Sequence, residues 1–363
     1  MRTISIASIR DSIVQRALYQ YSYDAVDRQL TGAVFGYRRG RSAHAAIRSL
    51  VDHITNGLGF VFDADLSSFF DTVDHDLLLA KVTSLGLEDR AGTLIRRFLK
   101  TGRVPSHQVR EHQEREGKQQ KYSPLPRCIG VPQGGVLSGL LSNLYLADFD
   151  IAIIHRFPGY IRYADDFVVC CHSADECEQV RRLVEEQLAT LRVTINTAKT
   201  QTCVHATRGV DFLGFRVSAR GVRVRNRNIA KFKSRIQNLL RRVSERIAQK
   251  PRLRETPERT LSYVCWRVSF KIRGPSEDQV RTLAERGQAI HPYRRSWIGF
   301  FRIVDDLAQI RGLDRWIRLQ VSQFMWREHR VRVRHRQMQE AGLPSLIKCL
   351  WKARSELSPD QEA

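Results

Sequence analysis

The stretch Gly159-Tyr160-Ile161-Arg162-Tyr163-Ala164-Asp165-Asp166-Phe167-Val168-Val169-Cys170-Cys171 decides the fold of this chain. Two largely apolar runs flank its centre, a pattern that predicts two strands joined by a tight turn. The turn carries two adjacent carboxylates, Asp165 and Asp166, which repel each other unless a cation neutralises them. Oxygen-only ligands favour a hard cation such as Mg²⁺. A pair of aspartates in a turn is also common as a solvated loop, so the rest of the chain has to be considered.

Two segments upstream carry related features. Residues 60–71 run from an apolar strand through Asp63 and Asp65 to the pair Phe69-Phe70, and the acidic segment Asp74-His75-Asp76 then opens a predicted helix. Residues 130–138 read Gly-Val-Pro-Gln-Gly-Gly-Val-Leu-Ser and lead into an apolar helix. Each element is common alone, but the three in this order and at these spacings form a specific pattern.

An aspartate on a strand, a Gln-Gly turn before a helix and a Tyr-x-Asp-Asp hairpin, in this order, resemble the bacterial reverse transcriptases of the group II intron-like lineage. Residues 10–18, 35–44, 196–200 and 212–215 look like the finger and palm blocks of that lineage. Residues 297–301, 313–318 and 326–327 are similar to its thumb or maturase region. The resemblance covers most of residues 1 to about 345 and is strongest over 35–217.

The resemblance implies an α+β fold. We expect a right-hand polymerase palm with partial fingers, built from an antiparallel sheet with helices, over residues 1–218. A basic α-helical thumb or maturase-like domain would follow over 219–345, and a C-terminal tail over 346–363. The implied activity is RNA-directed DNA polymerisation, in which dNTPs are joined to a 3′ hydroxyl by two-metal phosphoryl transfer.

The same resemblance assigns the catalytic residues. Asp65 and Asp165 would bridge two Mg²⁺ ions, for which Mn²⁺ could substitute, and Asp166 would be the third ligand. Asp65 is chosen over Asp63 because the family pattern places the phenylalanine of position 70 five residues after the metal ligand. Lys199 matches a family lysine near the leaving pyrophosphate, which it could protonate, although a lysine after a strand is more often simply exposed.

The nucleotide site is expected to include Phe70, whose ring would exclude a ribose 2′-hydroxyl, although a core phenylalanine is the simpler interpretation. The family pattern has proline where this chain has Gly139, so the entry to the following helix is expected to be looser and template handling atypical. The full set of residues expected to bind the nucleotide is Arg2, Ser68, Phe69, Phe70, Gln133 and Gly134.

The net charge of +22 is concentrated in the second half of the chain. Residues 205–354 hold about 35 Lys and Arg against about 12 Asp and Glu. This excess favours a polyanionic partner, because each neutralised phosphate releases counterions, whereas a solvated cationic surface is the alternative. The residues expected to contact primer or template are Arg38, Arg41, Tyr163, Phe212, Leu213, Gly214, Lys231, Arg235, Arg241 and Arg242.

The chain has 363 residues with 42% hydrophobic content, which is enough for a sizeable core. No run of 18 apolar residues predicts a membrane span, and no signal peptide is visible. The seven cysteines include no Cys-x-x-Cys pair, and Cys170 and Cys171 fall in an apolar strand. We therefore expect a reducing, cytoplasmic setting without zinc or a membrane partner.

Periodicity predicts the remaining elements. Strands are expected at 58–65, 192–196, 201–205 and 210–217, and helices at 74–84, 134–150 and 174–191. Residues 102–127 are polar and are expected to form a surface loop or hairpin. A helix with an apolar stripe from Ile229 to Ile247 is expected to carry lysine and arginine on its other faces.

The sequence leaves several functions open. The chain begins almost inside the first finger block and shows no paired-cysteine endonuclease segment, so we expect a stand-alone, domesticated enzyme. Such an enzyme could serve phage defence with a dedicated structured RNA, and a protein partner could supply the missing finger contacts. The alternatives are a maturase-like RNA-binding or splicing protein, and an RNA-templated or untemplated nucleotidyl transferase on the same palm.

Overall fold

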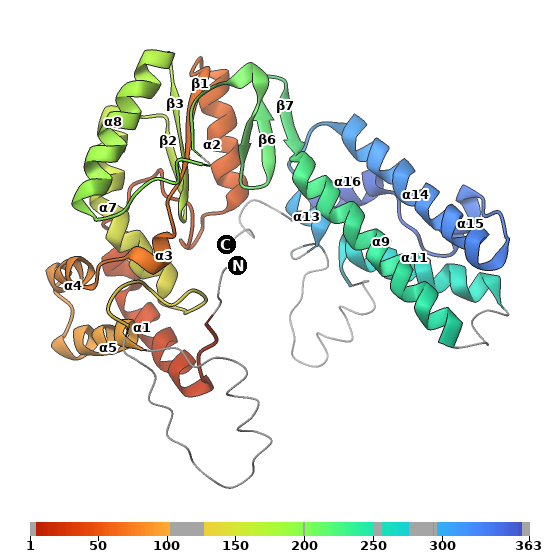
Figure 1. The fold of residues 1–363 in the computed structure, drawn as a ribbon, viewed down its shortest axis with the longest axis horizontal. Coiled ribbons are helices and arrows are strands. Elements are labelled where there is room, and N and C mark those ends of the chain that lie inside the picture. The colour runs from red at the N-terminus through yellow and green to blue at the C-terminus, as the bar shows by residue number, and fades with distance from the viewer. Residues whose placement is uncertain are drawn as a thin grey trace, which may run out of the picture. The chain divides into compact units, whose positions relative to one another are not determined.

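The computed structural model describes residues 5–101, 127–198, 200–249, 256–275, 293 and 296–357. The chain divides into two compact units, Met1–Leu213 and Gly214–Ala363, each of which combines strands and helices (Figure 1). This mixture of helices and antiparallel strands confirms the predicted α+β class. The division falls five residues before the predicted boundary at 218, because the strand that starts at residue 215 belongs to the second unit.

The first unit is built on a four-stranded sheet in the order β2-β3-β1-β4. Each strand pairs antiparallel with its neighbours, and the β2–β3 pair is the hairpin predicted from the sequence. The strands are β1 (Phe60–Asp65), β2 (Tyr160–Tyr163), β3 (Asp166–Cys171) and β4 (Gln201–His205).

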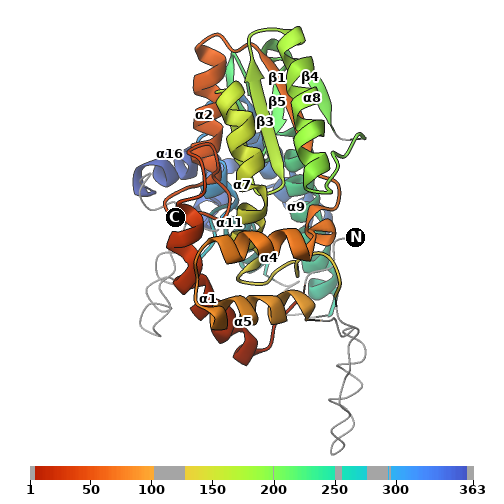
Figure 2. The same ribbon diagram turned by 90° about the vertical axis from the view of Figure 1, so that its left-hand side faces the viewer.

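Helices cover both faces of this sheet. Phe62 and Ala64 of β1 share one face with Phe167 and Val169 of β3, and all four are buried in the main core. Helices α7 (Ser138–Arg156) and α8 (Ala174–Thr190) pack on the sheet, in front of it in Figure 2, and complete that core. Helix α2 (Ala43–Thr55) contacts β2 and β3 and lies beside the sheet on its other side (Figure 1).

Local sequence explains several element boundaries. Helix α4 (His75–Ser84) begins after Asp74, whose carboxylate accepts hydrogen bonds from the amides of Asp76 and Leu77. Helix α7 begins at Ser138, four residues later than predicted, because the loop before it contains Gly134 at a φ of +95°. The unit also contains α1 (Ile9–Asp27), α3 (Phe69–Thr72), α5 (Asp89–Lys100) and β5 (Val210–Phe212).

The structure contradicts one prediction for the first unit and does not describe the segment of another. The strand predicted at 192–196 is wrong: the segment forms a turn and then a single isolated bridge between Ile195 and Leu66. Its apolar residue Val193 is buried in the main core without sheet pairing, and Ile195 packs against that core. The predicted loop at 102–127 lies outside the described residues except for Arg127.

The second unit is mainly helical. Its strands β6 (Phe215–Ser218) and β7 (Gly221–Val224) pair antiparallel. The expected apolar stripe is buried on α9 from Phe232 to Ile247, while Ile229 stays partly exposed. The helices are α9 (Asn226–Gln249), α11 (Pro257–Arg273), α13 (Trp297–Phe300), α14 (Leu307–His329), α15 (His335–Glu340) and α16 (Leu346–Glu356).

The predicted C-terminal tail is wrong over most of its length. Residues 346–356 form α16, which packs against α13 and α14 and buries Leu346, Leu350 and Ala353. The Asp314 carboxylate accepts a hydrogen bond of 3.2 Å from the amide of Leu346 at the first turn of this helix. These contacts make α16 part of the second unit's core.

The described helices include none that combines the length and hydropathy of a membrane span. All seven cysteines are free thiols, and Cys170 and Cys171 are buried in β3 as expected.

Candidate active site

Three polar side chains form a row across the sheet of the first unit. Asp65, the last residue of β1, lies directly opposite Asp166, the first residue of β3. Tyr163, the last residue of β2, lies opposite Asp166 on the other side. Residues directly opposed on antiparallel strands point to the same face, so Tyr163, Asp166 and Asp65 project side by side. The chain fold thus joins two aspartates that are 101 positions apart in sequence, with Asp165 next to them.

The carboxylates of this row are crowded. Burial first, then the charge of Asp165, and then a hydrogen bond and the charge of Asp65 raise the pKa of the Asp166 carboxyl from 3.8 to about 7. Asp63, one residue pair further along the same face, adds a smaller effect. The neighbouring carboxylates therefore add to burial in favouring the neutral form of Asp166.

Among the residues that the structure describes, no three acidic, imidazole or thiol groups are gathered tightly enough to hold a metal ion as they stand. The donor set nevertheless fits a hard divalent cation. Asp65, Asp165 and Asp166 offer only carboxylate oxygens, and the carboxylates of Asp165 and Asp65 add to burial in raising the pKa of Asp166.

The turn that carries Asp165 is held in an uncommon backbone conformation. Ala164 has a φ of +60°, which costs a residue other than glycine about 1–2 kcal/mol. The carbonyl oxygen of Ala164 accepts a hydrogen bond of 2.9 Å from Arg162 Nη1. On the other side, Gly36 lies so close to the amide nitrogen of Ala164 that a Cβ at position 36 would overlap it. The turn is therefore fixed from two sides.

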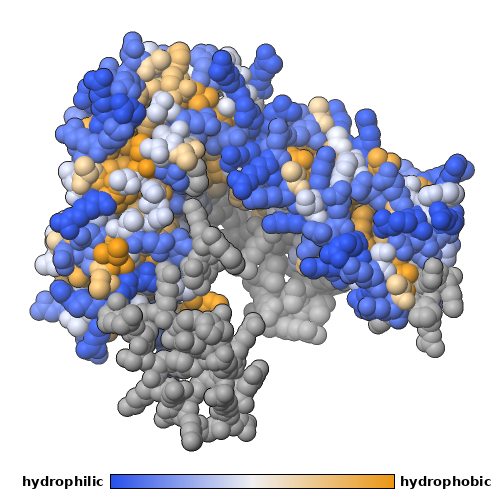
Figure 3. All heavy atoms as spheres, in the orientation of Figure 1, coloured by the Kyte–Doolittle hydropathy of each residue, from blue (hydrophilic) through white to orange (hydrophobic). Residues whose placement is uncertain are grey.

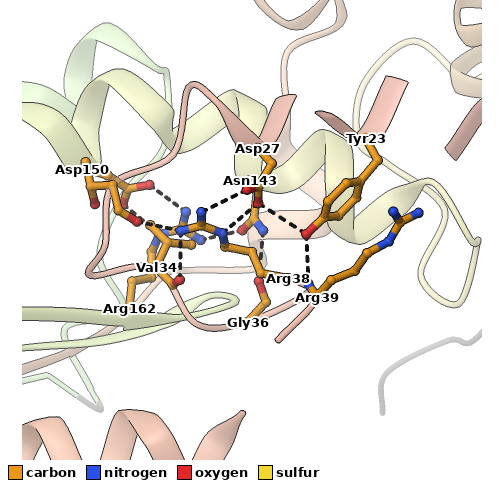
Figure 4. A network of polar contacts seen from close by, with 10 residues as sticks. Tyr23, Asp27, Val34, Gly36, Arg38, Arg39, Asn143, Asp150 and Arg162 are labelled. Atoms are coloured by element: carbon orange, nitrogen blue, oxygen red, sulfur yellow. Dashed lines mark hydrogen bonds and ion pairs between the residues drawn. The ribbon is translucent and has the colours of Figure 1, made fainter. Parts of the chain in front are cut away.

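Beneath the turn lies a fully buried ionic cluster (Figure 4). Arg162 Nε and Nη2 donate to the two oxygens of Asp150 at 2.7 and 2.6 Å, and both side chains have no exposed surface. The hydroxyl of Tyr160 also donates to Asp150, at 2.6 Å. Asn143 accepts from Arg162 Nη1 at 3.0 Å and donates to the carbonyl of Gly36 at 2.8 Å. The cluster thus links β2, α7 and the segment before α2.

The expected nucleotide-binding segments lie side by side. The amide of Val131 donates to the carbonyl of Phe70 at 2.6 Å, and the amide of Gly130 donates to the carbonyl of Val73 at 2.7 Å. These bonds place the loop of Gln133 and Gly134 next to the residues that follow Asp65. Within this group Ser68 and Gly134 are exposed, Gln133 is partly exposed, and Phe69 and Phe70 are buried.

Tyr37 occupies a position that the sequence did not single out. Its φ is +58°, its side chain is half exposed, and its ring meets that of Phe70 edge-on at 6.5 Å. A Cβ on Gly139 would overlap the Tyr37 ring. Gly139 is itself buried at the start of α7. The Tyr37 ring therefore fills the space that a side chain at position 139 would use, and the expected loosening of the helix entry stays a prediction.

Arg38, which was expected to contact primer or template, makes hydrogen bonds within the protein. Its Nε and Nη2 donate to Asp27 at 2.8 and 3.2 Å, and its Nη1 donates to the carbonyls of Thr31 and Val34 (Figure 4). The hydrogen bond from Arg38 lowers the pKa of Asp27 below 3.8, against the effect of burial. Arg41 is partly exposed and lies over the ring of Phe35 at 5.3 Å, which leaves it as a candidate contact.

The other expected contacts belong to the end of the first unit and to the second unit. Phe212 is buried in β5, and the next residues, Leu213 and Gly214, both have positive φ, of +48° and +88°. On α9, Lys231, Arg235, Arg241 and Arg242 are exposed, and Arg241 forms an ion pair with Glu245. Most of the visible surface of the second unit is hydrophilic (Figure 3). Arg2 and Lys199 lie outside the described residues.

Sequence reasoning missed the cluster of Arg162, Asp150 and Asn143. A signal was present, because an arginine stands within an apolar strand, and two polar residues seven positions apart share one face of an apolar helix. Buried charges are rare unless they are paired, so this pattern predicts a mutual contact.

Comparison with known proteins places this geometry in a family. The family model described as "Reverse transcriptase (RNA-dependent DNA polymerase)" matches residues 1–217, which is more than half of the chain. The chain belongs to the reverse transcriptase family. A second model, "Group II intron, maturase-specific domain", matches residues 268–342 of this reverse transcriptase. Together the two matches confirm the group II intron-like lineage inferred from the sequence.

Individual relatives support the same placement. Protein YkfC of Escherichia coli is 30% identical over 257 residues, covering 60% of this chain and 63% of the relative. The group II intron-encoded protein LtrA of Lactococcus lactis is 28% identical over 150 residues, covering 41% and 22%. These matches span less than two thirds of either relative. The structure of apo telomerase from Candida tropicalis aligns with a TM-score of 0.43 and 13% identity, covering 95% of this chain and 58% of that one.

Proposed function

We propose that this protein is an RNA-directed DNA polymerase that joins dNTPs to the 3′ hydroxyl of a primer. The observation that carries the proposal is the row of Tyr163, Asp166 and Asp65 across three strands, with Asp165 at the turn beside it. Carboxylates that converge from separate strands are what two-metal phosphoryl transfer requires, because a single turn cannot surround both ions.

In this proposal Asp65, Asp165 and Asp166 hold divalent cations, with Mg²⁺ as the physiological ion and Mn²⁺ as a substitute. When bound, the cations favour deprotonation of the primer hydroxyl and stabilise the charge that develops on the phosphate and on pyrophosphate. The protein contributes by holding the carboxylates in fixed positions. The buried cluster under the turn holds the carboxylates in place before any substrate arrives, so that little reorganisation is needed during the reaction.

The nucleotide would bind beside the carboxylates, between the segment of Phe70 and the loop of Gln133 and Gly134. Val131 and Phe70 are joined by a backbone hydrogen bond, so the two segments form one wall. Phe70 is 6% exposed, which leaves it as a gate against the 2′-hydroxyl only at its accessible edge. Arg2 remains a predicted contact of the triphosphate, and Lys199 remains a predicted contact of the leaving pyrophosphate.

The second unit would hold RNA or an RNA–DNA duplex. Exposed lysine and arginine on α9 suit phosphate contacts, which position a nucleic acid without reading its bases. The maturase-specific match over residues 268–342 favours a second role, the binding of a folded RNA as in an intron maturase. We propose a dedicated structured RNA as the partner. A protein partner that supplies the missing finger contacts remains a prediction, as does a role in phage defence.

The deciding experiment is primer extension on an RNA template with purified protein and each nucleotide class in turn. We expect incorporation of dNTPs that requires Mg²⁺ or Mn²⁺ and is lost when the metal is chelated. A preference for NTPs would instead support an RNA polymerase. Extension without a template would support a terminal nucleotidyl transferase, and RNA binding without any extension would support a maturase-like binder.

A further inference from the structure

The carbonyl of Ala164 receives its hydrogen bond from an unusual donor. Arg162 has no exposed surface, and its guanidinium donates to four oxygens on three partners: Asp150 Oδ1 and Oδ2, Asn143 Oδ1 and Ala164 O. The first three acceptors are side-chain atoms of α7. The fourth is a backbone atom of the turn that joins β2 to β3, immediately before Asp165.

Stability alone does not explain a buried ion pair at this place. Withdrawing two charges from water is so unfavourable that apolar residues of similar size often serve a core equally well. Phe167, which lies opposite Arg162 on β3, and Phe149, whose ring meets that of Phe167, show that this core accepts large apolar side chains. An apolar residue at position 162 would fill space, but it could not donate a hydrogen bond to Ala164.

That hydrogen bond acts on a residue whose backbone conformation is unfavourable. Ala164 has a positive φ, a conformation that persists only where its surroundings enforce it. Gly36 closes the amide side of Ala164, and Arg162 holds the carbonyl side. Asn143 connects the two residues that restrain Ala164. It accepts a hydrogen bond from Arg162 and donates one to the carbonyl of Gly36 (Figure 4).

We propose that Arg162 is a positioning residue for the reaction: from within the protein it fixes the Ala164 carbonyl and thereby the direction in which Asp165 and Asp166 present their carboxylates. This role rests on the proposed polymerase function. Asp150 orients the guanidinium through both of its oxygens, and Asn143 sets its rotation. None of the three touches substrate.

The test compares a variant that lacks the donor with one that leaves it in place. Arg162→Met combined with Asp150→Asn removes both charges together, so no uncompensated charge stays buried, and the amide oxygen of the introduced asparagine can still accept from Tyr160. The matched control, Tyr160→Phe, removes a 2.6 Å hydrogen bond to the same carboxylate but leaves Arg162 and Ala164 joined. Thermal unfolding shows first whether each variant folds.

Two readouts follow for the folded proteins. The first is Mn²⁺ binding to the protein alone, measured by the electron paramagnetic resonance signal of the free ion, with Asp165→Asn/Asp166→Asn as the reference for the site. The second is the split between kcat and KM in primer extension. For Arg162→Met/Asp150→Asn we expect Mn²⁺ affinity to fall at least fivefold and kcat to fall about tenfold or more. Affinity for the primer–template should be unchanged, and Tyr160→Phe should stay within about twofold in every measurement.

Wild-type Mn²⁺ affinity and wild-type kcat in the folded double variant would overturn the role, because the cluster would then serve stability alone. Should the double variant fail to fold, Arg162→Lys is measured instead. It keeps the charge beside Asp150 but has no planar fork to reach four acceptors; normal kcat with lysine at this position would equally overturn the proposal. A wild-type protein that extends no primer would contradict the proposed function rather than the role of Arg162.

Discussion

Asp65 and Asp166 lie directly opposite each other on β1 and β3, and no residue separates them. Like charges directly opposed across two strands destabilise a sheet. Burial, followed by the charge of Asp165 and the hydrogen bond and charge of Asp65, raises the pKa of Asp166. An arrangement that weakens the fold at this point is understandable when the carboxylates serve a ligand that neutralises them.

Replacement of both turn carboxylates, Asp165→Asn together with Asp166→Asn, should abolish metal-dependent dNTP incorporation on a primed RNA template. Circular dichroism should show an intact fold, since removing repelling charges from a partly exposed turn rarely destabilises a protein. The control is Asp63→Asn, one residue pair away on the same face, which should retain most activity. Extension by the double variant at the wild-type rate would refute the assignment of the site.

Phe70→Ala should raise the use of NTPs relative to dNTPs by opening space beside the sugar, without changing the metal requirement. The measurement is the ratio of kcat/KM for the two nucleotide classes. Phe69→Ala is the comparison variant. The sequence placed Phe69 in the nucleotide site too, but Phe69 is 1% exposed and packs against Tyr145 in the core. It should lower the melting temperature and leave the ratio unchanged. If both substitutions leave the ratio at its wild-type value, Phe70 is a core residue.

Gly139→Ala should destabilise the first unit by about 1–3 kcal/mol, because the new methyl group overlaps the Tyr37 ring and displaces it from Phe70. The same change in a Tyr37→Ala background should have little effect, as the obstructing ring is then absent. Gly92→Ala in α5 is the control: no atom lies within 4 Å of its added Cβ, and it should stabilise by about 0.5–1 kcal/mol. Chemical denaturation compares the wild type with Gly139→Ala, Tyr37→Ala, the double variant and Gly92→Ala. An equal loss in both backgrounds would place the cause outside this contact.

Arg38→Met should lower stability at neutral pH and have a smaller effect in acid. The pKa of Asp27 is lowered in the folded protein by its bond to Arg38, so this pair stabilises the fold above the ordinary value of 3.8 and ceases to do so as the pH falls below it. The difference in melting temperature between wild type and variant should therefore shrink below about pH 3.8. Binding of a primer–template by the folded variant should be unaffected; a marked loss would restore Arg38 as a strand contact.

Arg235→Ala with Arg242→Ala, two exposed positions on α9, should weaken the binding of an RNA–DNA duplex mainly at low salt. Each phosphate contact that is lost should reduce the slope of log K against log salt by roughly one unit. Arg181→Ala with Arg182→Ala on α8 removes the same charge from residues paired with Glu178, and should leave the slope unchanged. An unchanged slope for the α9 variant would show that this surface is solvated and binds no strand.

The sequence predicted those parts of the fold that depend on local pattern. Apolar runs predicted β1 and the β2–β3 hairpin nearly to the residue, and an apolar stripe predicted α9. The resemblance supplied the pairing of Asp65 with the turn, which no local pattern contains. The prediction of a strand at 192–196 failed because an apolar segment can be buried without pairing to a sheet. Helix α16 was not predicted because its buried face is defined by its contacts with α13 and α14.

The supporting residues of the site could be predicted less well, for a physical reason. Arg162 meets Asp150 and Asn143 across 12 and 19 positions, and only the folded arrangement brings their hydrogen-bonding groups together without water. Tyr37 and Gly139 are complementary in shape, which composition cannot express. Residues of this kind become visible once distances are known.

The closeness of Gly36 to Ala164 has a consequence for engineering this enzyme. The segment around Gly36, the hairpin with Arg162 and Ala164, and helix α7 with Asn143 and Asp150 meet in close contact. They therefore behave as one exchangeable part. A chimera that imports only the Tyr-Ala-Asp-Asp hairpin from a relative would import half of a matched interface. A graft that carries all three segments from the same donor should keep its catalytic turn intact, even though they are far apart in the chain.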